Sequence, residues 1–185
     1  MSPTPTVRYK VWDPAIRLFH WALAGFFAAE ALWIPPEETL HRQIGYVIVM
    51  LVGFRALWGV FGTRHARFSD FPPSASAALA QLSDMATGRR HLHLGHSPLG
   101  ALMIYNLLVA MLMIGLSGWL MTTDALRERG WPAELHQLTV HWAELSVVAH
   151  VVAVVFESRR LRVNLARAMV TGYKVVSKPM GTDPE

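Results

Sequence analysis

The stretch VWDPAIRLFHWALAGFF, residues 11–27, places a cation and an imidazole at the start of a long apolar segment. Asp13 followed by Pro14 is typical of a helix start, because aspartate caps free amide groups and proline fits the first turn. The residues that follow are apolar enough to enter a membrane, yet Arg17 and His20 lie within the first two turns. Ionisable side chains in a membrane span are costly and by default mark a functional site.

The composition of the whole chain is that of a membrane protein. Of its 185 residues, 52% are hydrophobic and 16% are charged, whereas a water-soluble domain carries about 25% charged residues. The absence of cysteine excludes disulfides, iron–sulfur clusters, thiolate metal sites and covalent haem attachment through cysteine. The formal charge of +4 does not indicate a nucleic-acid partner, because the basic residues are segregated along the chain.

Four segments are long and apolar enough to cross a bilayer, which takes about 20 helical residues. The sequence therefore predicts an all-α fold, an integral membrane four-helix transmembrane bundle that forms one domain over residues 1–185. Short interfacial helices are expected in the 62–97 connection and in the basic tail, residues 158–185. The predicted spans are residues 16–34, 40–61, 98–121 and 134–157.

The distribution of basic residues predicts the orientation. Thirteen lysines and arginines lie in the N-terminal arm, the 62–97 connection and the tail after Glu157, against three in the two short loops. This bias places both termini in the cytoplasm. A cleaved signal peptide is the alternative, since the first apolar run ends near Ala29-Glu30-Ala31. A secretory segment has no need of Arg17 or His20, so we expect the segment to remain as a span.

Histidines occur at two depths in the predicted bundle. His20 lies near the cytoplasmic end of the first span and His41 near the external end of the second. His136 and His150 are 14 residues apart on the fourth span, which places them about 40° apart around the helix and about 21 Å apart along it. His141 points away from both. Depth therefore pairs His20 with His150, and His41 with His136, whereas four unrelated core histidines would not predict matched depths.

Paired imidazoles across a helix bundle, without thiolate or carboxylate partners, suit a flat iron macrocycle with both axial positions filled. Haem propionates would need cations. Arg17 shares a face with His20, and Arg55 lies 14 residues beyond His41, at the level of the other pair. A lone arginine in a span costs about 2.5–3.5 kcal/mol, which a propionate would offset. Snorkelling of either arginine to the surface is the alternative.

Several further residues admit two interpretations. His96 comes directly before the third span and is expected at the interface, close to a propionate or a quinone. Glu30 and Glu144 could relay protons, or could form hydrogen bonds to neighbouring helices. Gly115 and Gly118 are compatible with packing in a homodimer.

Taken together, these stretches resemble the prokaryotic cytochrome b561 family, which includes the b-type cytochrome subunits of nickel–iron hydrogenases. The resemblance covers nearly the whole chain. The motifs that carry it are VWDPAIRLFHW (11–21), LHRQIGYVIVMLVGFRALWGVFGTRHARFSDF (40–71), LGHSPLGALM (94–103), ELHQ (134–137) with VVAHVVAVV (147–155), and NLARAMVTGYK (164–174).

The resemblance implies two non-covalent b haems with His20, His41, His136 and His150 as axial ligands. It also implies quinone-linked electron transfer across the bacterial inner (cytoplasmic) membrane, with ubiquinone or menaquinone and a c-type cytochrome or another redox protein as partners. The short turn PPEE, residues 35–38, departs from what a large docking partner would need, which argues against a hydrogenase subunit.

Two other functions remain to be weighed against a dihaem electron carrier. A superoxide:quinone oxidoreductase is known in the wider family, although the predicted basic face lies on the cytoplasmic side. A histidine-lined metal permease would need polar residues along a continuous path with a site near mid-membrane. The imidazoles instead cluster at two depths near the ends, which favours the electron carrier.

Overall fold

The computed structural model describes residues 6–126 and 128–177. These residues form α-helices joined by short loops, two single-turn 3-10 helices and one pair of strands. In chain order the elements are β1 (Thr6–Lys10), α1 (Pro14–Leu32), α2 (Thr39–Phe61), η1 (Arg64–Ala66), η2 (Phe68–Asp70), α3 (Ala75–Ala86), α4 (Pro98–Leu120), α5 (Trp131–Leu161), α6 (Leu165–Thr171) and β2 (Tyr173–Ser177).

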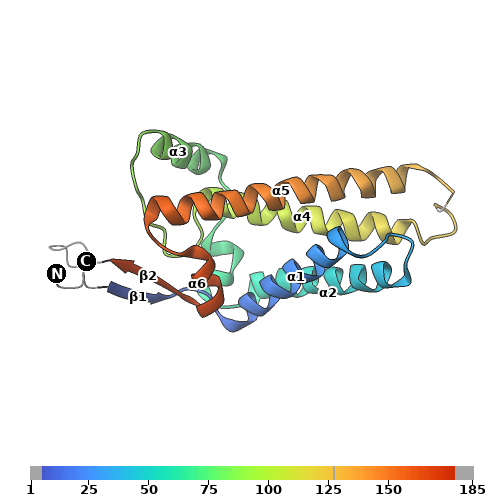
Figure 1. Ribbon diagram of the computed structural model, residues 1–185, viewed down its shortest axis with the longest axis horizontal. Helices are drawn as coiled ribbons and strands as arrows, with labels where there is room; N and C mark the ends of the chain where they lie inside the picture. Colours follow the sequence, from blue (N-terminus) through green and yellow to red (C-terminus); the bar gives the residue numbers. More distant parts are fainter. Residues whose placement is uncertain (1–5, 127, 178–185) are drawn as a thin grey trace.

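The predicted all-α membrane fold with four spans is confirmed. Helices α1, α2, α4 and α5 have the length and composition of membrane spans, with mean hydropathies from 1.3 to 2.2. They run side by side, with β1 and β2 at one end and the α1–α2 and α4–α5 connections at the other (Figure 1). We call these the terminal end and the loop end. Helix α5 is longer than predicted, since it continues to Leu161.

Side-chain caps at two of the helix starts match the sequence signals. Asp13 Oδ1 accepts a hydrogen bond of 2.9 Å from the Ile16 amide at the start of α1. Ser97 Oγ accepts one of 3.2 Å from the Gly100 amide at the start of α4. Proline occupies the first turn of both helices. These caps satisfy amides that have no partner within the helix.

Large apolar side chains face outward from the bundle. Leu18 is 74% exposed, Leu138 69% and Val148 61%, although each lies on a predicted span. Water would oppose apolar exposure on this scale, so these faces require an apolar surrounding. The outward faces, together with the four spans, make the chain a multi-pass membrane protein.

Helix α4 occupies the centre of the packing arrangement. Close backbone contacts join α1 to α2, α2 to α4, and α4 to α5. A Cβ atom at Gly115 of α4 would lie 2.3 Å from Val49 of α2, so glycine permits this close approach. Gly115 therefore packs within the chain, where the sequence had suggested a contact between subunits. No comparably close packing joins α5 to α1 or α2 in the described part of the chain.

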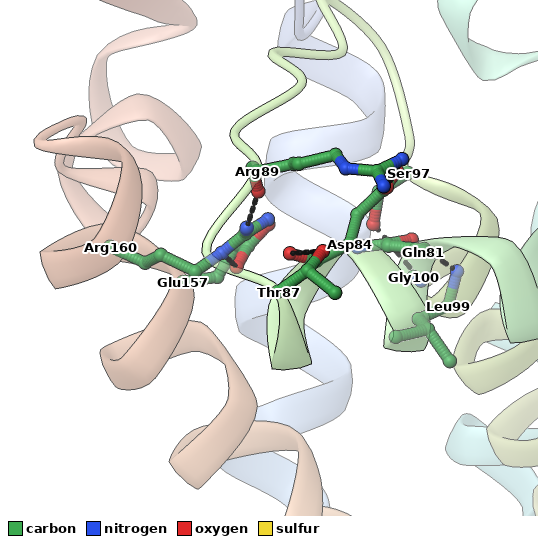
Figure 2. Close-up of polar contacts among 9 residues, drawn as sticks. All are labelled: Gln81, Asp84, Thr87, Arg89, Ser97, Leu99, Gly100, Glu157 and Arg160. Atoms are coloured by element: carbon green, nitrogen blue, oxygen red, sulfur yellow. Dashed lines mark hydrogen bonds and ion pairs between the residues drawn. The ribbon is translucent and has the colours of Figure 1, made fainter.

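Polar contacts hold α3 and the following loop against the terminal end of the bundle (Figure 2). Gln81 Oε1 accepts a hydrogen bond of 3.0 Å from the Leu99 amide in the first turn of α4. Arg160 donates to both oxygens of Glu157, at 2.7 and 2.9 Å, and to the Arg89 carbonyl at 2.6 Å. The short surface helix expected in the 62–97 connection is thus α3, and it is fixed from both sides.

The terminal end also carries a small antiparallel sheet that the sequence did not predict. Strands β1 and β2 pair with Thr6 opposite Ser177 and Lys10 opposite Tyr173. Lys174 of β2 is 5% exposed, and its Nζ donates 2.9 Å hydrogen bonds to the carbonyls of His93 and Gly95. The predicted interfacial tail thus contains α6 and β2, and its residues 178–185 lie outside the described residues.

Candidate functional site

Four histidines lie in two facing pairs at opposite ends of the bundle. The ring centroids of His20 on α1 and His150 on α5 are 6.4 Å apart, toward the terminal end. Those of His41 on α2 and His136 on α5 are 6.2 Å apart, toward the loop end. We call these the terminal-end pair and the loop-end pair. They bring together the residues that depth in the sequence pairs, whereas His141 is exposed.

The spacing within each pair is that of two imidazoles sharing one metal ion. A metal midway between the rings would lie about 3.1–3.2 Å from each centroid. A ring nitrogen lies about 1.2 Å from its own centroid, which leaves about 2 Å, the length of a bond from histidine to a first-row metal such as zinc. The centroid spacing of both pairs therefore matches one metal ion held between two imidazoles whose nitrogens face each other.

Both pairs lie between α5 and the helices α1 and α2, which do not pack closely against α5 in the described residues. Helix α5 supplies one histidine to each pair, and its partners come from α1 and α2, with which it makes no comparably close packing in the described residues. A Cβ atom at Gly45, one turn after His41, would meet no atom within 4 Å. Gly45 lies about 40° around the helix from His41, so this open space leaves room for a flat group to approach the α2 backbone beside the loop-end pair.

The loop-end pair has hydrogen-bonding groups behind its rings. His136 Nδ1 lies 3.0 Å from the Ile114 carbonyl and 3.1 Å from Ser117 Oγ, both on α4. A carbonyl only accepts, so this contact places the proton on Nδ1 and leaves the Nε2 lone pair free to bind a metal. Gly118 makes room for the ring, since a Cβ atom there would lie 3.3 Å from His136 Cε1.

A carboxyl group stands behind the other ring of the loop-end pair. Glu30, near the end of α1, contacts Nδ1 of His41. Its side chain is 11% exposed, and neither of its oxygens has a hydrogen-bond partner among the described residues, so the contact with His41 is an ion-pair contact. Metal-binding histidines commonly donate their second ring nitrogen to a carboxylate or a carbonyl. In the loop-end pair, His136 Nδ1 faces a carbonyl within hydrogen-bond distance, and His41 Nδ1 makes an ion-pair contact with a carboxyl group.

The terminal-end pair lacks such partners. His20 Nδ1 is buried, and no described residue accepts a hydrogen bond from it. The ring instead packs edge-on against Trp21, with centroids 5.2 Å apart. The two pairs therefore have the same spacing and different surroundings.

The two arginines predicted beside the site have different environments. Arg55 is 4% exposed, and its guanidinium lies 4.6 Å from the ring centre of Phe68. Its Nη1 atom has no partner within the described residues, and no described carboxylate pairs with it. A buried cation without an anion is costly, so this side chain is suited to an acidic ligand. Arg17 donates to the Val170 carbonyl, and its buried Nε has no hydrogen-bond partner among the described residues.

His96 lies near Arg55, beneath aromatic side chains at the terminal end. Its ring centroid is 4.6 Å from that of Trp12 and 4.1 Å from that of Phe71. Burial, together with the charges of Arg55 and Lys174, lowers the pKa of His96 to about 3. The ring is therefore neutral at physiological pH, and its buried Nδ1 has no partner in the described part of the chain.

A model of the prokaryotic cytochrome b561 family matches residues 11–172. The chain belongs to the prokaryotic cytochrome b561 family. It is a b-type haem membrane cytochrome of electron transfer. Comparison with curated proteins and with solved structures gives no significant match.

The residues of this cytochrome fit haem on three structural observations. Each histidine pair has the spacing of two axial ligands, the interval beside α5 is open, and a buried arginine lacks an anion. Haem needs all three, since it is flat, binds through its iron and carries two propionates.

Sequence reasoning missed the groups behind the loop-end pair. A backbone carbonyl and a serine within an apolar span carry no signal for the support of a histidine, so Ile114 and Ser117 could not be assigned. Glu30 stood out as an ionisable residue in a span, but its contact with His41 depends on how the α1–α2 turn folds.

Proposed function

We propose that this cytochrome holds two non-covalent b haems and transfers electrons between the quinone pool and a redox partner across the cytoplasmic membrane. The observation that carries the proposal is the presence of two histidine pairs with nearly equal ring spacing, 6.4 and 6.2 Å, at opposite ends of one bundle. One haem would lie between His20 and His150, and the other between His41 and His136.

Bound haem would supply a one-electron iron couple at each end of the bundle. The four histidines would hold the two irons, and electrons would then pass without a substrate binding to the metal. Arg17 and Arg55 are the cations proposed for the propionates, and the unpaired Nη1 of Arg55 supports this role. The protein thus fixes spacing, burial and local charge, which are the means by which a protein sets a haem potential.

The orientation of the proposed pathway in the membrane follows from the distribution of basic residues. The terminal end carries most of the lysines and arginines, so we assign it to the cytoplasm and the loop end to the outside of the inner membrane. Electrons would pass between a donor or acceptor at the loop end and one at the terminal end. Ubiquinone or menaquinone and a c-type cytochrome are the partners we propose.

Haem quantification tests the proposal directly. The purified protein should contain two low-spin b haems per chain. His150→Ala should remove the terminal-end haem and His136→Ala the loop-end haem, leaving one haem in each variant. His141→Ala is the matched control, because this exposed histidine lies on the same helix and should leave both haems bound. A protein with no haem, or with two haems in both ligand variants, would contradict the assignment.

Two further observations distinguish the electron carrier from a superoxide:quinone oxidoreductase and from a metal permease. Superoxide oxidation under quinone-limited conditions would identify a superoxide:quinone oxidoreductase, whereas quinol oxidation without it supports the electron carrier. A metal permease requires a liganding cluster, and no group of three histidine, aspartate or glutamate side chains within residues 6–126 and 128–177 could hold a metal ion.

A further inference from the structure

The two histidine pairs match in spacing but differ in the groups that stand behind their rings. In the loop-end pair, His136 Nδ1 faces the Ile114 carbonyl at 3.0 Å, and His41 Nδ1 faces the Glu30 carboxyl group. In the terminal-end pair, His20 Nδ1 has neither a hydrogen-bond partner nor an ion-pair partner among the described residues, whereas His41 Nδ1 lacks a hydrogen bond but has the Glu30 contact. The two pairs therefore differ in the groups that contact the Nδ1 atoms of the histidines, and these groups would not bind the metal themselves.

An acceptor behind an axial imidazole changes the iron that the imidazole binds. When Nδ1–H donates to a carboxyl or carbonyl oxygen, the ring becomes a stronger electron donor through its other nitrogen. A stronger donor stabilises ferric iron over ferrous iron, which lowers the reduction potential. Hydrogen bonding to ligands and local charge are among the factors through which a protein sets haem potentials.

Charge on the two halves of the bundle acts in the same direction. Glu30 brings an acidic group to the loop-end pair, with its side chain 11% exposed. The terminal half instead holds Arg55, a buried cation without a described anionic partner. A nearby cation favours the reduced, less positive iron, and an acidic group disfavours it, as Coulomb's law requires in a medium of low dielectric constant.

We propose that Glu30 is a positioning residue that holds His41 through Nδ1 and lowers the reduction potential of the loop-end haem below that of the terminal-end haem. Electrons then run energetically downhill from the loop end to the terminal end. The inference rests on the proposed dihaem function and goes beyond it, because it assigns an order to the two potentials and names the residue that sets it.

A purely structural role for Glu30 would make a different prediction. Glu30 lies near the end of α1 and His41 near the start of α2, so the contact could serve only to join the two helices across their turn. Loss of a helix contact of that kind would reduce thermal stability and leave both potentials where they are. The potential of one specific haem is therefore the decisive measurement.

The experiment is a spectroelectrochemical titration of the purified two-haem protein and of Glu30→Gln and Glu30→Ala. Glutamine keeps a neutral acceptor, whereas alanine removes the acceptor. We expect the loop-end potential to rise in the order wild type, Gln, Ala. For alanine the expected change is about tenfold in the one-electron reduction equilibrium, or about 59 mV. Each haem is identified by repeating the titration in His150→Ala, which retains the loop-end haem alone.

Glu144→Gln is the matched control. It removes the same charge from another half-buried glutamate of a membrane span, one with no described contact to a paired histidine. Both potentials should remain at their wild-type values in this variant.

Three results would overturn the inference. They are unchanged potentials in both Glu30 variants, a shift confined to the terminal-end haem, or loss of the loop-end haem from both variants, which would mark Glu30 as needed for assembly. A wild-type protein whose loop-end haem has the higher potential would overturn the proposed order of potentials. Failure of the dihaem function is separate, because it would appear in the wild type as fewer than two haems, before Glu30 is changed.

Discussion

Ser117 Oγ lies 3.1 Å from Nδ1 of His136, on a serine that is fully buried in α4. The same hydroxyl lies 2.7 Å from the Met113 carbonyl, to which it donates, so its oxygen remains free to accept from the imidazole. The ring of His136 is thus fixed by α4, the helix that contributes no histidine to either pair. We expect α4 to act as the support against which the loop-end site is built.

This support predicts a size limit at Gly118. A Cβ atom there would lie 3.3 Å from His136 Cε1, closer than ordinary van der Waals contact, so alanine should displace the ring slightly and valine substantially. We expect Gly118→Val to lower occupancy of the loop-end haem several-fold, as measured by haem content per chain. Gly53→Val is the control, because a Cβ atom at Gly53 would meet nothing within 4 Å. Full occupancy in Gly118→Val would contradict this role of α4.

Asp13 predicts an acid-sensitive junction between α1 and α2. It caps α1 and accepts hydrogen bonds from Thr63 Oγ1 at 2.6 Å and Trp58 Nε1 at 3.3 Å. Burial raises its pKa, but these hydrogen bonds outweigh burial and leave the pKa below its ordinary value. We expect Asp13→Ala to cost about 1–2 kcal/mol of stability, the upper range for loss of a cap.

The pH dependence of this contribution follows from the direction of the shift. A carboxyl group with a lowered folded pKa stabilises the fold above its unfolded value of about 3.9 and loses that effect as pH falls through the folded value. Thermal midpoints of wild type and Asp13→Ala should therefore converge in acid. Asp84→Ala is the control, because the contacts of the Asp84 carboxylate within the described residues are two ion pairs of 3.6 Å with exposed side chains. A gap between wild type and Asp13→Ala that persists at low pH would contradict the assignment.

The spans could be predicted from sequence because their signals are local. Hydropathy over about 20 residues and the Asp13-Pro14 and Ser97-Pro98 starts fix α1 and α4 without knowledge of tertiary contacts. Depth in the membrane then limits which histidines can meet, since a helix advances at a fixed rise per residue. The structure accordingly brings His20 and His150 together, with ring centroids 6.4 Å apart.

The remaining features depend on contacts between distant segments. Strand β1 can form only when β2, more than 160 residues later, lies beside it, and neither five-residue strand has a hydrophobic face long enough to be recognised alone. Lys174 looked like one more basic residue of an interfacial tail, yet it is buried against a loop from the middle of the chain. The two strands thus pair at the terminal end of the bundle, through partners that no local pattern reveals.

Lys174 is expected to hold β2 against the loop that contains His93 and Gly95. Its Nζ satisfies the carbonyls of His93 and Gly95, each at 2.9 Å, and burial lowers the pKa of Lys174 to about 8. Lys174→Met would leave two carbonyls without their donor, at a cost of about 1–3 kcal/mol for each group that stays buried. Limited proteolysis of the terminal end should be faster in this variant. Lys10→Met, an exposed lysine of the paired strand, should behave as wild type.

The pKa of Lys174 also has a consequence for stability. Between pH 8 and about 10.4, Lys174 is deprotonated in the folded protein but still protonated in the unfolded chain. The free energy of unfolding therefore increases as pH rises through this range, because the buried lysine no longer carries a charge. Lys174→Met should lack this increment. Identical alkaline profiles for wild type and Lys174→Met would show that the lysine is not buried as a cation.

His96 predicts a second acid transition, at higher pH than that of Asp13. Burial and the charges of Arg55 and Lys174 hold the pKa of His96 at about 3, although Asp70 opposes them. The unfolded chain binds a proton at this residue below about pH 6.5 while the folded chain does not, so stability falls as pH decreases from 6.5 toward 3.

His96→Phe keeps an aromatic ring between Trp12 and Phe71 but cannot be protonated. We expect thermal midpoints measured between pH 4.5 and 6.5 to fall less steeply in this variant than in wild type. His91→Phe, an exposed histidine of the same loop, should retain the wild-type slope. Equal slopes for wild type and His96→Phe would mean that the folded protein accepts the proton, which the neutral, buried ring does not allow.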